Sequence, residues 1–192
     1  TNNFDIVNFH IAYPNAINIE KLSQHYPNLK FVITEHWTAY SNSFSLAKGS
    51  KGRGRIESIF NNKIPLFVVS TALGQDIQKF IGNAKKQFTI IPNVIDCENF
   101  KYKIKEESDE FVFCSINNWN SMKNPFVLIK AFHKLTRTHK NVKLVLGGTG
   151  NIIGEMKSLA SKMKLNSNIT FTGRLSKKEV VDTLNDSNVY CQ

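Results

Sequence analysis

Short apolar runs alternate with helical-length segments along the whole chain, and this alternation limits the fold more than any other feature of the sequence. The segments between the runs carry apolar residues at three- and four-residue spacing, which is typical of amphipathic helices. A repeated strand-helix-strand pattern predicts an α/β protein with parallel sheets and helices on both faces. The predicted strands are Asp5–His10, Phe31–His36, Leu66–Ser70, Phe88–Pro92, Phe111–Ile116, Val142–Leu146, Ile169–Thr172 and Val189–Cys191. The predicted helices are Asn18–Tyr26, Arg55–Asn62, Ala72–Ile81, Pro125–Thr138, Gly154–Leu165 and Lys177–Asn185.

One polar interval, residues 97–110, lacks both periodicities and is dense in charge, so it is predicted to be a linker. It divides the chain into two Rossmann-like units, residues 1–96 and 111–192. Each unit has about four predicted strands, whereas a doubly wound domain usually has about five or six. We therefore expect both units to be incomplete.

The composition excludes several classes of protein. The 192 residues include no apolar run near the roughly 18 residues of a membrane span. Three cysteines without metal-ligand spacing indicate neither a disulfide framework nor a zinc site, which favours a cytoplasmic protein. The net charge of +10 is spread along the chain and points only weakly to an anionic partner. We do not expect a nucleic-acid partner, because no recognised binding motif accompanies the charge.

Polar residues end the strands of the first unit. His10 ends the first strand, Glu35 and His36 end the second, Ser70 the third and Asn93 the fourth. Each residue alone is explained as well by helix capping and backbone hydrogen bonding. Capping is a weaker explanation for two histidines and a carboxylate that lie together at the edge where parallel sheets bind ligands. We therefore predict that Glu35 and His36 contact a substrate.

In the second unit, the first strand is followed by the turn 117–124 and then Pro125. Asn124 is a good N-cap and Pro125 a good first helical residue, so a helix N-terminus begins there beside Lys123. A lysine next to a helix N-terminus suits a phosphate or pyrophosphate, although a solvated surface lysine is an equally good interpretation.

The next turn is rich in glycine. Gly148, Gly150 and Gly154 give the spacing G-x-G-x-x-x-G, and Arg174 ends the following strand. This pattern is close to a dinucleotide fingerprint with a 2′-phosphate partner, so an NADP-dependent oxidoreductase is one alternative. The fingerprint normally lies in the first strand-to-helix turn of its sheet, and here it lies in the second.

A third feature is the basic segment 48–55, in which glycines separate Lys48, Lys51, Arg53 and Arg55. We expect a mobile loop without packing. It is interpreted as a solvated loop or as a contact for anionic membrane lipids, for a phosphorylated acceptor or, least favoured, for nucleic acid. A non-catalytic module that binds an anionic surface is a further alternative.

Taken in order, these motifs resemble the family 4 glycosyltransferases of the GT-B fold. The resemblance covers nearly the whole chain and rests on DIVNFH, FVITEHWTAY, VVSTALGQDI, IIPNVID, NNWNSMKN with IKAFHKL, LVLGGTG, ITFTGRLSKKEV and SNVYC. It implies a retaining, metal-independent, cofactor-free enzyme of the hexosyltransferase type. Such an enzyme transfers a sugar from a nucleotide-diphosphate donor to a polysaccharide, lipid-linked or other cell-surface glycan acceptor.

The resemblance also implies roles for single residues. His10 matches a histidine that faces the donor sugar, and the first histidine of that family motif is Asn8 here. Lys123 matches the lysine that holds the donor pyrophosphate, and Asn118 stands where the family has a partner arginine. His10 and Lys123 are therefore the expected catalytic residues. The remaining expected donor contacts are Gly148, Gly150, Gly173 and Arg174.

Two family elements do not occur in the 192 residues: a glycine-rich loop that would lie before Thr1 and an E-x7-E segment that would follow Gln192. We therefore expect an internal fragment of a longer enzyme. By itself this fragment is expected to bind the donor poorly or not at all and to have little activity.

Overall fold

The computed structural model describes residues 4–42, 48–104 and 108–192. The chain divides into two compact units, residues 1–95 and 96–192, which are considered one at a time. Both units are α/β, and each contains a four-stranded, fully parallel sheet. The predicted fold class is therefore confirmed.

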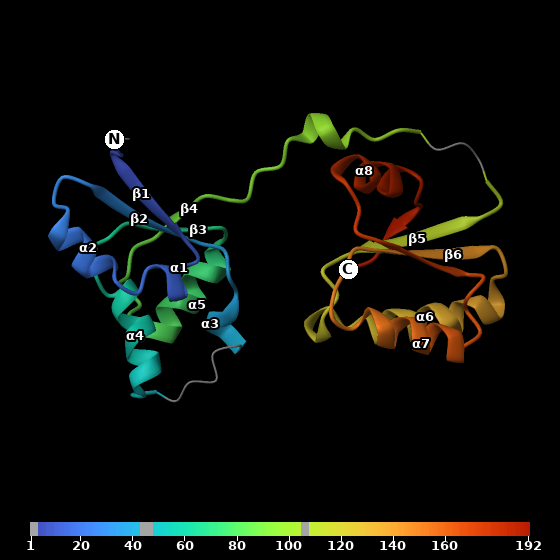
Figure 1. Ribbon diagram of the computed structural model, residues 1–192, viewed down its shortest axis with the longest axis horizontal. Coiled ribbons are helices and arrows are strands. Elements are labelled where there is room, and N and C mark those ends of the chain that lie inside the picture. The colour runs from blue at the N-terminus through green and yellow to red at the C-terminus, as the bar shows by residue number, and fades with distance from the viewer. Residues whose placement is uncertain (1–3, 43–47, 105–107) are drawn as a thin grey trace. The chain divides into compact units, whose positions relative to one another are not determined.

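The first unit has the strand order β1-β2-β3-β4, so each strand is added on the same side of the last. Right-handed crossovers that always step in one direction place every helix on the same face of a sheet. Figure 1 shows these helices beneath the sheet. The expectation of helices on both faces is therefore wrong for this unit. Its elements are β1 (Ile6–His10), α1 (Ala12–Asn15), α2 (Ile19–His25), β2 (Lys30–Glu35), α3 (Ala39–Asn42), α4 (Lys51–Phe60), β3 (Leu66–Val68), α5 (Thr71–Ile81) and β4 (Thr89–Ile90).

The side chains of β1 divide between the two faces of this sheet. Val7 and Phe9 pack against the core that the helices form with β2 and β3. Ile6, Asn8 and His10 lie on the opposite face and are exposed. The alternation follows from the two-residue period of a strand. It places His10 at the carboxyl end of β1, on the face where the described residues of this unit form no helix.

The second unit has the strand order β7-β6-β5-β8. The chain steps outward from β5 to β7 and then returns past β5 to β8, which reverses the direction of the crossover. In Figure 1, α6 and α7 lie on one face of the sheet and α8 on the other, as in a doubly wound fold. Its elements are β5 (Phe111–Ile116), α6 (Pro125–Thr138), β6 (Val142–Gly147), α7 (Ile153–Lys162), β7 (Ile169–Gly173), α8 (Lys177–Asn185) and β8 (Val189–Tyr190), with short 3-10 helices η1 (Cys97–Phe100) and η2 (Ser121–Lys123).

Part of the predicted linker is held against α8. Asp96 caps η1 by accepting a hydrogen bond from the Glu98 backbone N–H. The Asn185 side chain accepts from the Lys103 backbone N–H at 2.8 Å and donates to the Lys101 carbonyl at 3.2 Å. Residues 97–104 therefore belong to the second unit by their contacts. Residues 105–107 lie outside the described residues.

The prediction that the basic segment 48–55 is an unpacked loop is wrong from Lys51 onward. The Ser50 hydroxyl accepts from the Arg53 backbone N–H and caps α4, which begins at Lys51. Arg53 bonds Glu57 at 2.8 Å and the Phe80 carbonyl, and its guanidinium lies over the Phe80 ring. A good cap and an apolar helix face outweigh the helix-breaking tendency of the two glycines in the first turns.

In the part of the chain that the structure describes, no helix is long and apolar enough to cross a membrane.

Candidate functional site

The carboxyl edge of the first sheet carries a network of polar side chains that the sequence predicted to lie there. The His10 and His36 rings stack with centroids 5.2 Å apart and planes 15° apart, and His10 Nδ1 lies 2.9 Å from His36 Nε2. His36 Nδ1 lies 3.1 Å from Asn93 Oδ1, which joins the end of β4 to the same network. The structure therefore brings both histidines and Asn93 together.

Glu35 has a different position from the one expected of a substrate-binding residue, because its side chain is fully buried. One carboxylate oxygen accepts from the backbone N–H groups of His36 and Trp37, at 2.9 and 2.8 Å. The other accepts from the Ala12 backbone N–H at 2.9 Å and from the Tyr40 hydroxyl at 2.6 Å. Glu35 thus fixes the backbone of the two turns that follow β1 and β2.

The contacts of Glu35 affect a neighbouring tyrosine and a strained turn, neither of which the sequence predicted. Burial, followed by the charge and hydrogen bond of Glu35, raises the pKa of the Tyr40 hydroxyl. Ile11, between His10 and Ala12, has φ of 62°, a left-handed conformation that is strained for a β-branched residue. The bond from Ala12 to Glu35 and one from the Ile11 N–H to the Thr34 carbonyl, at 3.0 Å, hold this turn.

Ser70 has a structural position. Its hydroxyl accepts from the Leu73 backbone N–H at 3.2 Å and caps α5. This is the capping interpretation of a polar residue at a strand end, and it is confirmed for this residue.

At the carboxyl edge of the second sheet, the predicted residues lie on three turns that touch through their backbones. The Trp119 N–H donates to the Thr149 carbonyl at 2.7 Å, which joins the turn after β5 to the turn after β6. The Gly148 N–H donates to the Gly173 carbonyl at 2.7 Å, which joins that turn to the end of β7. The turns that carry Asn118, Lys123, Gly148, Gly150, Gly173 and Arg174 therefore form one continuous edge.

The glycines of this edge serve the fold directly. A Cβ on Gly148 would lie 2.0 Å from the Asn117 carbonyl oxygen, and one on Gly150 would lie 2.0 Å from that of Trp119. Trp119 itself is buried, and its indole N–H donates to the Gly147 carbonyl at 2.8 Å. Gly173 is needed for its φ of 72°, since a Cβ there would meet nothing within 4 Å. The G-x-G spacing thus lets one turn approach another.

The charged residues of this edge have no partner in the described part of the chain. Lys123 and Arg174 are exposed, and neither side chain forms a hydrogen bond or ion pair with a described residue. Lys123 ends η2 one residue before Asn124, which has a left-handed φ of 45°. Asn124 occupies the N-cap position of α6 but makes no side-chain cap, whereas Pro125 is at the first helical position as predicted.

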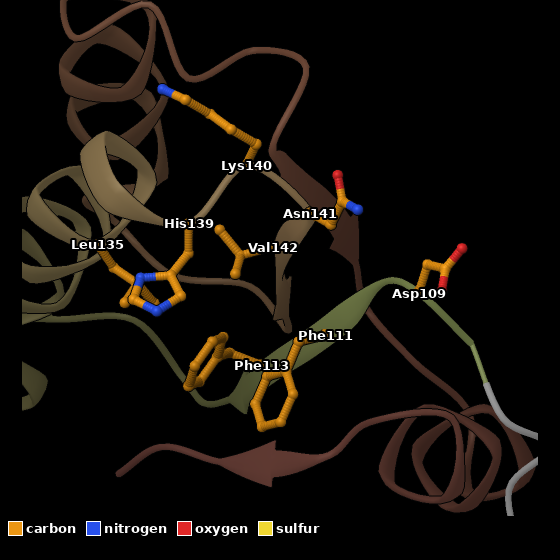
Figure 2. Close-up of a pocket in the computed structure, with 8 residues that line it drawn as sticks. All are labelled: Asp109, Phe111, Phe113, Leu135, His139, Lys140, Asn141 and Val142. Carbon is orange, nitrogen blue, oxygen red and sulfur yellow. The ribbon is translucent and has the colours of Figure 1, made fainter.

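A separate pocket of about 520 Å³ lies at the opposite edge of this sheet, where β5 and β6 begin. Figure 2 shows the Phe111 and Phe113 rings beside each other and the Lys140 side chain extending away from them. None of the predicted site residues lines this pocket. Ligands of open parallel sheets bind beyond the carboxyl ends of the strands, so the pocket is not the expected donor site. Its lining residues are Asp109, Phe111, Phe113, Leu135, His139, Lys140, Asn141 and Val142.

Comparison with known proteins assigns the class. The family model of the glycosyl transferases group 1 matches residues 96–192, and the chain belongs to this family. An uncharacterized glycosyltransferase of Methanocaldococcus jannaschii is 26% identical over 106 residues, which are 50% of this chain and 26% of that protein.

Solved structures of glycosyltransferases share the fold. Sucrose-phosphate synthase from Thermosynechococcus elongatus has a TM-score of 0.77 and 14% identity, over 97% of this chain and 49% of that one. Anabaena HepE in complex with UDP and glucose has a TM-score of 0.74 and 14% identity, over 97% of this chain and 52% of the HepE chain. The chain thus has the GT-B fold and spans about a quarter of the curated relative and about half of these two structures.

Proposed function

We propose that the protein carrying this chain transfers a sugar from a nucleotide-diphosphate donor, and that the edge carrying Lys123 holds the donor diphosphate. The observation that supports this most is that Lys123, Arg174 and the N-terminus of α6 lie on turns joined by hydrogen bonds, and that neither cationic side chain has a partner among the described residues. HepE, which has the same fold, was crystallised with UDP and glucose.

The chemistry follows from the charge that develops in the reaction. When the sugar leaves its donor, negative charge accumulates on the departing nucleoside diphosphate. A lysine and a helix N-terminus at that charge stabilise the transition state without a metal ion. Among the described residues no cluster of three or more His, Cys, Asp or Glu side chains is placed to hold a metal. Lys123 carries the positive charge at this site in our proposal, and Arg174 contacts the nucleotide.

The other catalytic residue in the proposal is His10, with His36 beside it, at the carboxyl edge of the first sheet. We propose that the reaction is a transfer of a hexose with retention of configuration, that the acceptor is a polysaccharide, lipid-linked or other cell-surface glycan, and that no cofactor takes part. Anomeric NMR signals of the product test retention: an inverted anomer would contradict it.

The test of the donor site is a Lys123→Ala variant of the protein that carries this chain, assayed for sugar transfer. We expect kcat/KM to fall about 100-fold, or about 3 kcal/mol, as for other groups that stabilise transition-state charge. Lys130→Ala, an exposed lysine further along α6, is the matched control and should retain full activity. Equal activity of the two variants would contradict the assigned role of Lys123.

The NADP-dependent alternative has less support than sugar transfer, because the fold by itself explains two of its glycines. Gly148 and Gly150 are required because the turn after β5 approaches them closely. They also follow β6, the second strand of this unit along the chain, whereas a dinucleotide fingerprint normally follows the first. Titration with NADPH remains a direct check, and tight binding that Arg174→Ala abolishes would support an oxidoreductase over a glycosyltransferase.

We further propose a peripheral contact with anionic membrane through the basic segment. Arg53 is engaged within the fold, but Lys48, Lys51 and Arg55 are exposed, and Lys51 and Arg55 lie one turn apart on α4. Sedimentation with phosphatidylserine vesicles should show binding that is lost in Lys51→Glu/Arg55→Glu and at high salt. Lys63→Glu, an exposed lysine after α4, is the control. Equal binding to phosphatidylcholine vesicles would refute the contact.

A further inference from the structure

The histidine pair of the first unit lies in the middle of a longer chain of hydrogen bonds that runs from β2 to the end of β4. The Thr34 hydroxyl bonds Asn8 Oδ1 at 2.9 Å, and Asn8 Nδ2 lies 3.3 Å from His10 Nε2. The chain continues through the His10–His36 contact to Asn93 Oδ1. Every ring nitrogen of both histidines therefore has one partner.

The partners at the two ends determine which nitrogen carries a proton. A carboxamide oxygen only accepts, so Asn93 Oδ1 requires a proton on His36 Nδ1. The neutral His36 ring then has a bare Nε2, which requires a proton on His10 Nδ1. That leaves His10 Nε2 bare, and it faces Asn8 Nδ2, which only donates. All the hydrogen bonds thus agree with one pair of neutral tautomers.

Asn8 has a second partner on the side away from the histidines. Thr34 is buried, and its hydroxyl donates to Asn8 Oδ1, which turns the amide nitrogen of Asn8 toward His10. In β1 and β2 the residues Asn8 and Val32 are paired and His10 is paired with Thr34, so the contact between Asn8 and Thr34 is diagonal across the sheet.

We infer that Asn8 and Asn93 are positioning residues that hold His10 as the neutral tautomer with its proton on Nδ1, so that its bare Nε2 accepts a hydrogen bond from a substrate hydroxyl. The hydroxyl takes the place of the long 3.3 Å contact from Asn8. The substrate part of this inference rests on the proposed sugar transfer, since it is the sugar or acceptor that supplies the hydroxyl. The tautomer part rests on the hydrogen bonds alone.

The inference makes His10 an acceptor and not a cation at the reaction centre. A positively charged His10 would place a proton on Nε2, opposite the amide N–H groups of Asn8. It would also remove the only bare nitrogen that the pair offers to a ligand. The second histidine serves to orient the first, because the bare Nε2 of His36 accepts the hydrogen bond that the His10 Nδ1–H donates.

The test is ¹⁵N NMR of the histidine rings in the 192-residue chain, at a pH about two units above the ordinary imidazole pKa of about 6.5. For the unaltered chain we expect Nδ1 of His10 to have the chemical shift of an N–H nitrogen and Nε2 that of a bare nitrogen. The opposite pattern, with the proton on Nε2, would overturn the inference.

Asn8→Asp tests the role of Asn8, because a carboxylate cannot donate to Nε2 and attracts a proton there. We expect His10 Nε2 to become protonated in this variant at the same pH. The matched control is Asn15→Asp: Asn15 Nδ2 bonds the His10 carbonyl at 2.9 Å and not the ring, so this equal change of charge should leave Nε2 bare. An Nε2 that stays bare in Asn8→Asp would overturn the inference.

Asn8→Leu serves if Asn8→Asp does not fold. It removes the donor to His10 Nε2 without adding charge, so we expect both neutral tautomers of His10 to appear. A single tautomer with its proton on Nδ1 would show that Asn8 does not hold the His10 tautomer. None of these spectra requires a substrate. A normal tautomer in a protein that transfers no sugar would therefore contradict the proposed function alone.

Discussion

The carboxyl edges of the two sheets are built in different ways. In the first unit, polar side chains hold the edge together: Glu35 accepts four hydrogen bonds, three from backbone N–H groups and one from Tyr40, and His10, His36 and Asn93 form a connected row. In the second unit, backbone groups and glycines hold the turns together, and Lys123 and Arg174 extend from them without described partners. The first edge is suited to fixing the orientation of neutral groups, and the second to receiving an anion from solution.

The largest effect is expected where the first edge depends on one buried charge. Glu35→Gln replaces one of two oxygens, each of which accepts two hydrogen bonds, by an amide nitrogen that donates, so at least one backbone N–H at this edge loses its charged acceptor. We expect the free energy of unfolding of the first unit to fall by about 4 kcal/mol, measured by urea unfolding. Glu57→Gln, which removes a partly exposed i,i+4 pair with Arg53, should cost less than about 1 kcal/mol. Similar losses for the two variants would contradict this view of the first edge.

The second edge should be most sensitive at Gly150. A Cβ there would lie 2.0 Å from a backbone oxygen that cannot rotate away, so Gly150→Ala should destabilise the second unit by about 3 kcal/mol. The matched control is Gly154→Ala in α7, where a Cβ meets nothing within 4 Å. It should stabilise the unit by about 0.5 to 1 kcal/mol through helix propensity. Thermal unfolding of the two variants decides this, and a tolerated Gly150→Ala would show that the turns do not approach as described.

A smaller effect on the free energy of unfolding, which depends on pH, is expected at the first edge alone. Tyr40→Phe removes a hydrogen bond to a carboxylate and should cost about 2 kcal/mol at neutral pH. Because the folded-state pKa of Tyr40 is raised, the folded chain keeps a proton that the unfolded chain loses above pH of about 10. Stability that involves Tyr40 is therefore present below pH 10 or so and is lost above it by about 1.4 kcal/mol per pH unit. The difference between the two proteins in urea unfolding should shrink accordingly, and a constant difference from about pH 8 to 11 would disprove the linkage.

Much of the fold follows from patterns within single elements. The bounds of β5, α6 and α8 agree with the sequence prediction residue by residue, because Pro125, the Ser176 capping box and strong apolar periodicity mark them. The four-residue helices α1 and α3 were missed, since one helical turn has no detectable period. The start of α4 was missed because two glycines concealed the Ser50 cap.

The candidate site was predictable in part. The position of His10, His36 and Asn93 at strand ends was enough to predict that they lie close together, because parallel strands end at the same edge of a sheet. The burial of Glu35 and the bond between Asn8 and Thr34 depend on contacts between residues more than twenty positions apart, which no local pattern contains. The structural need for Gly148 and Gly150 was likewise hidden, because the same spacing occurs where a ligand approaches. Their roles in binding stay predictions.

The most direct test of the account is to add UDP- and GDP-sugars at millimolar concentrations to the isotope-labelled chain and to follow the amide signals by NMR. We expect shifts at the edge of the second unit, around Asn118, Lys123, Gly148 and Arg174, and a clear loss of these shifts in Lys123→Ala. Shifts at this edge that persist unchanged in Lys123→Ala, or shifts confined to the residues that line the 520 Å³ pocket at the opposite edge, would contradict the proposed donor site.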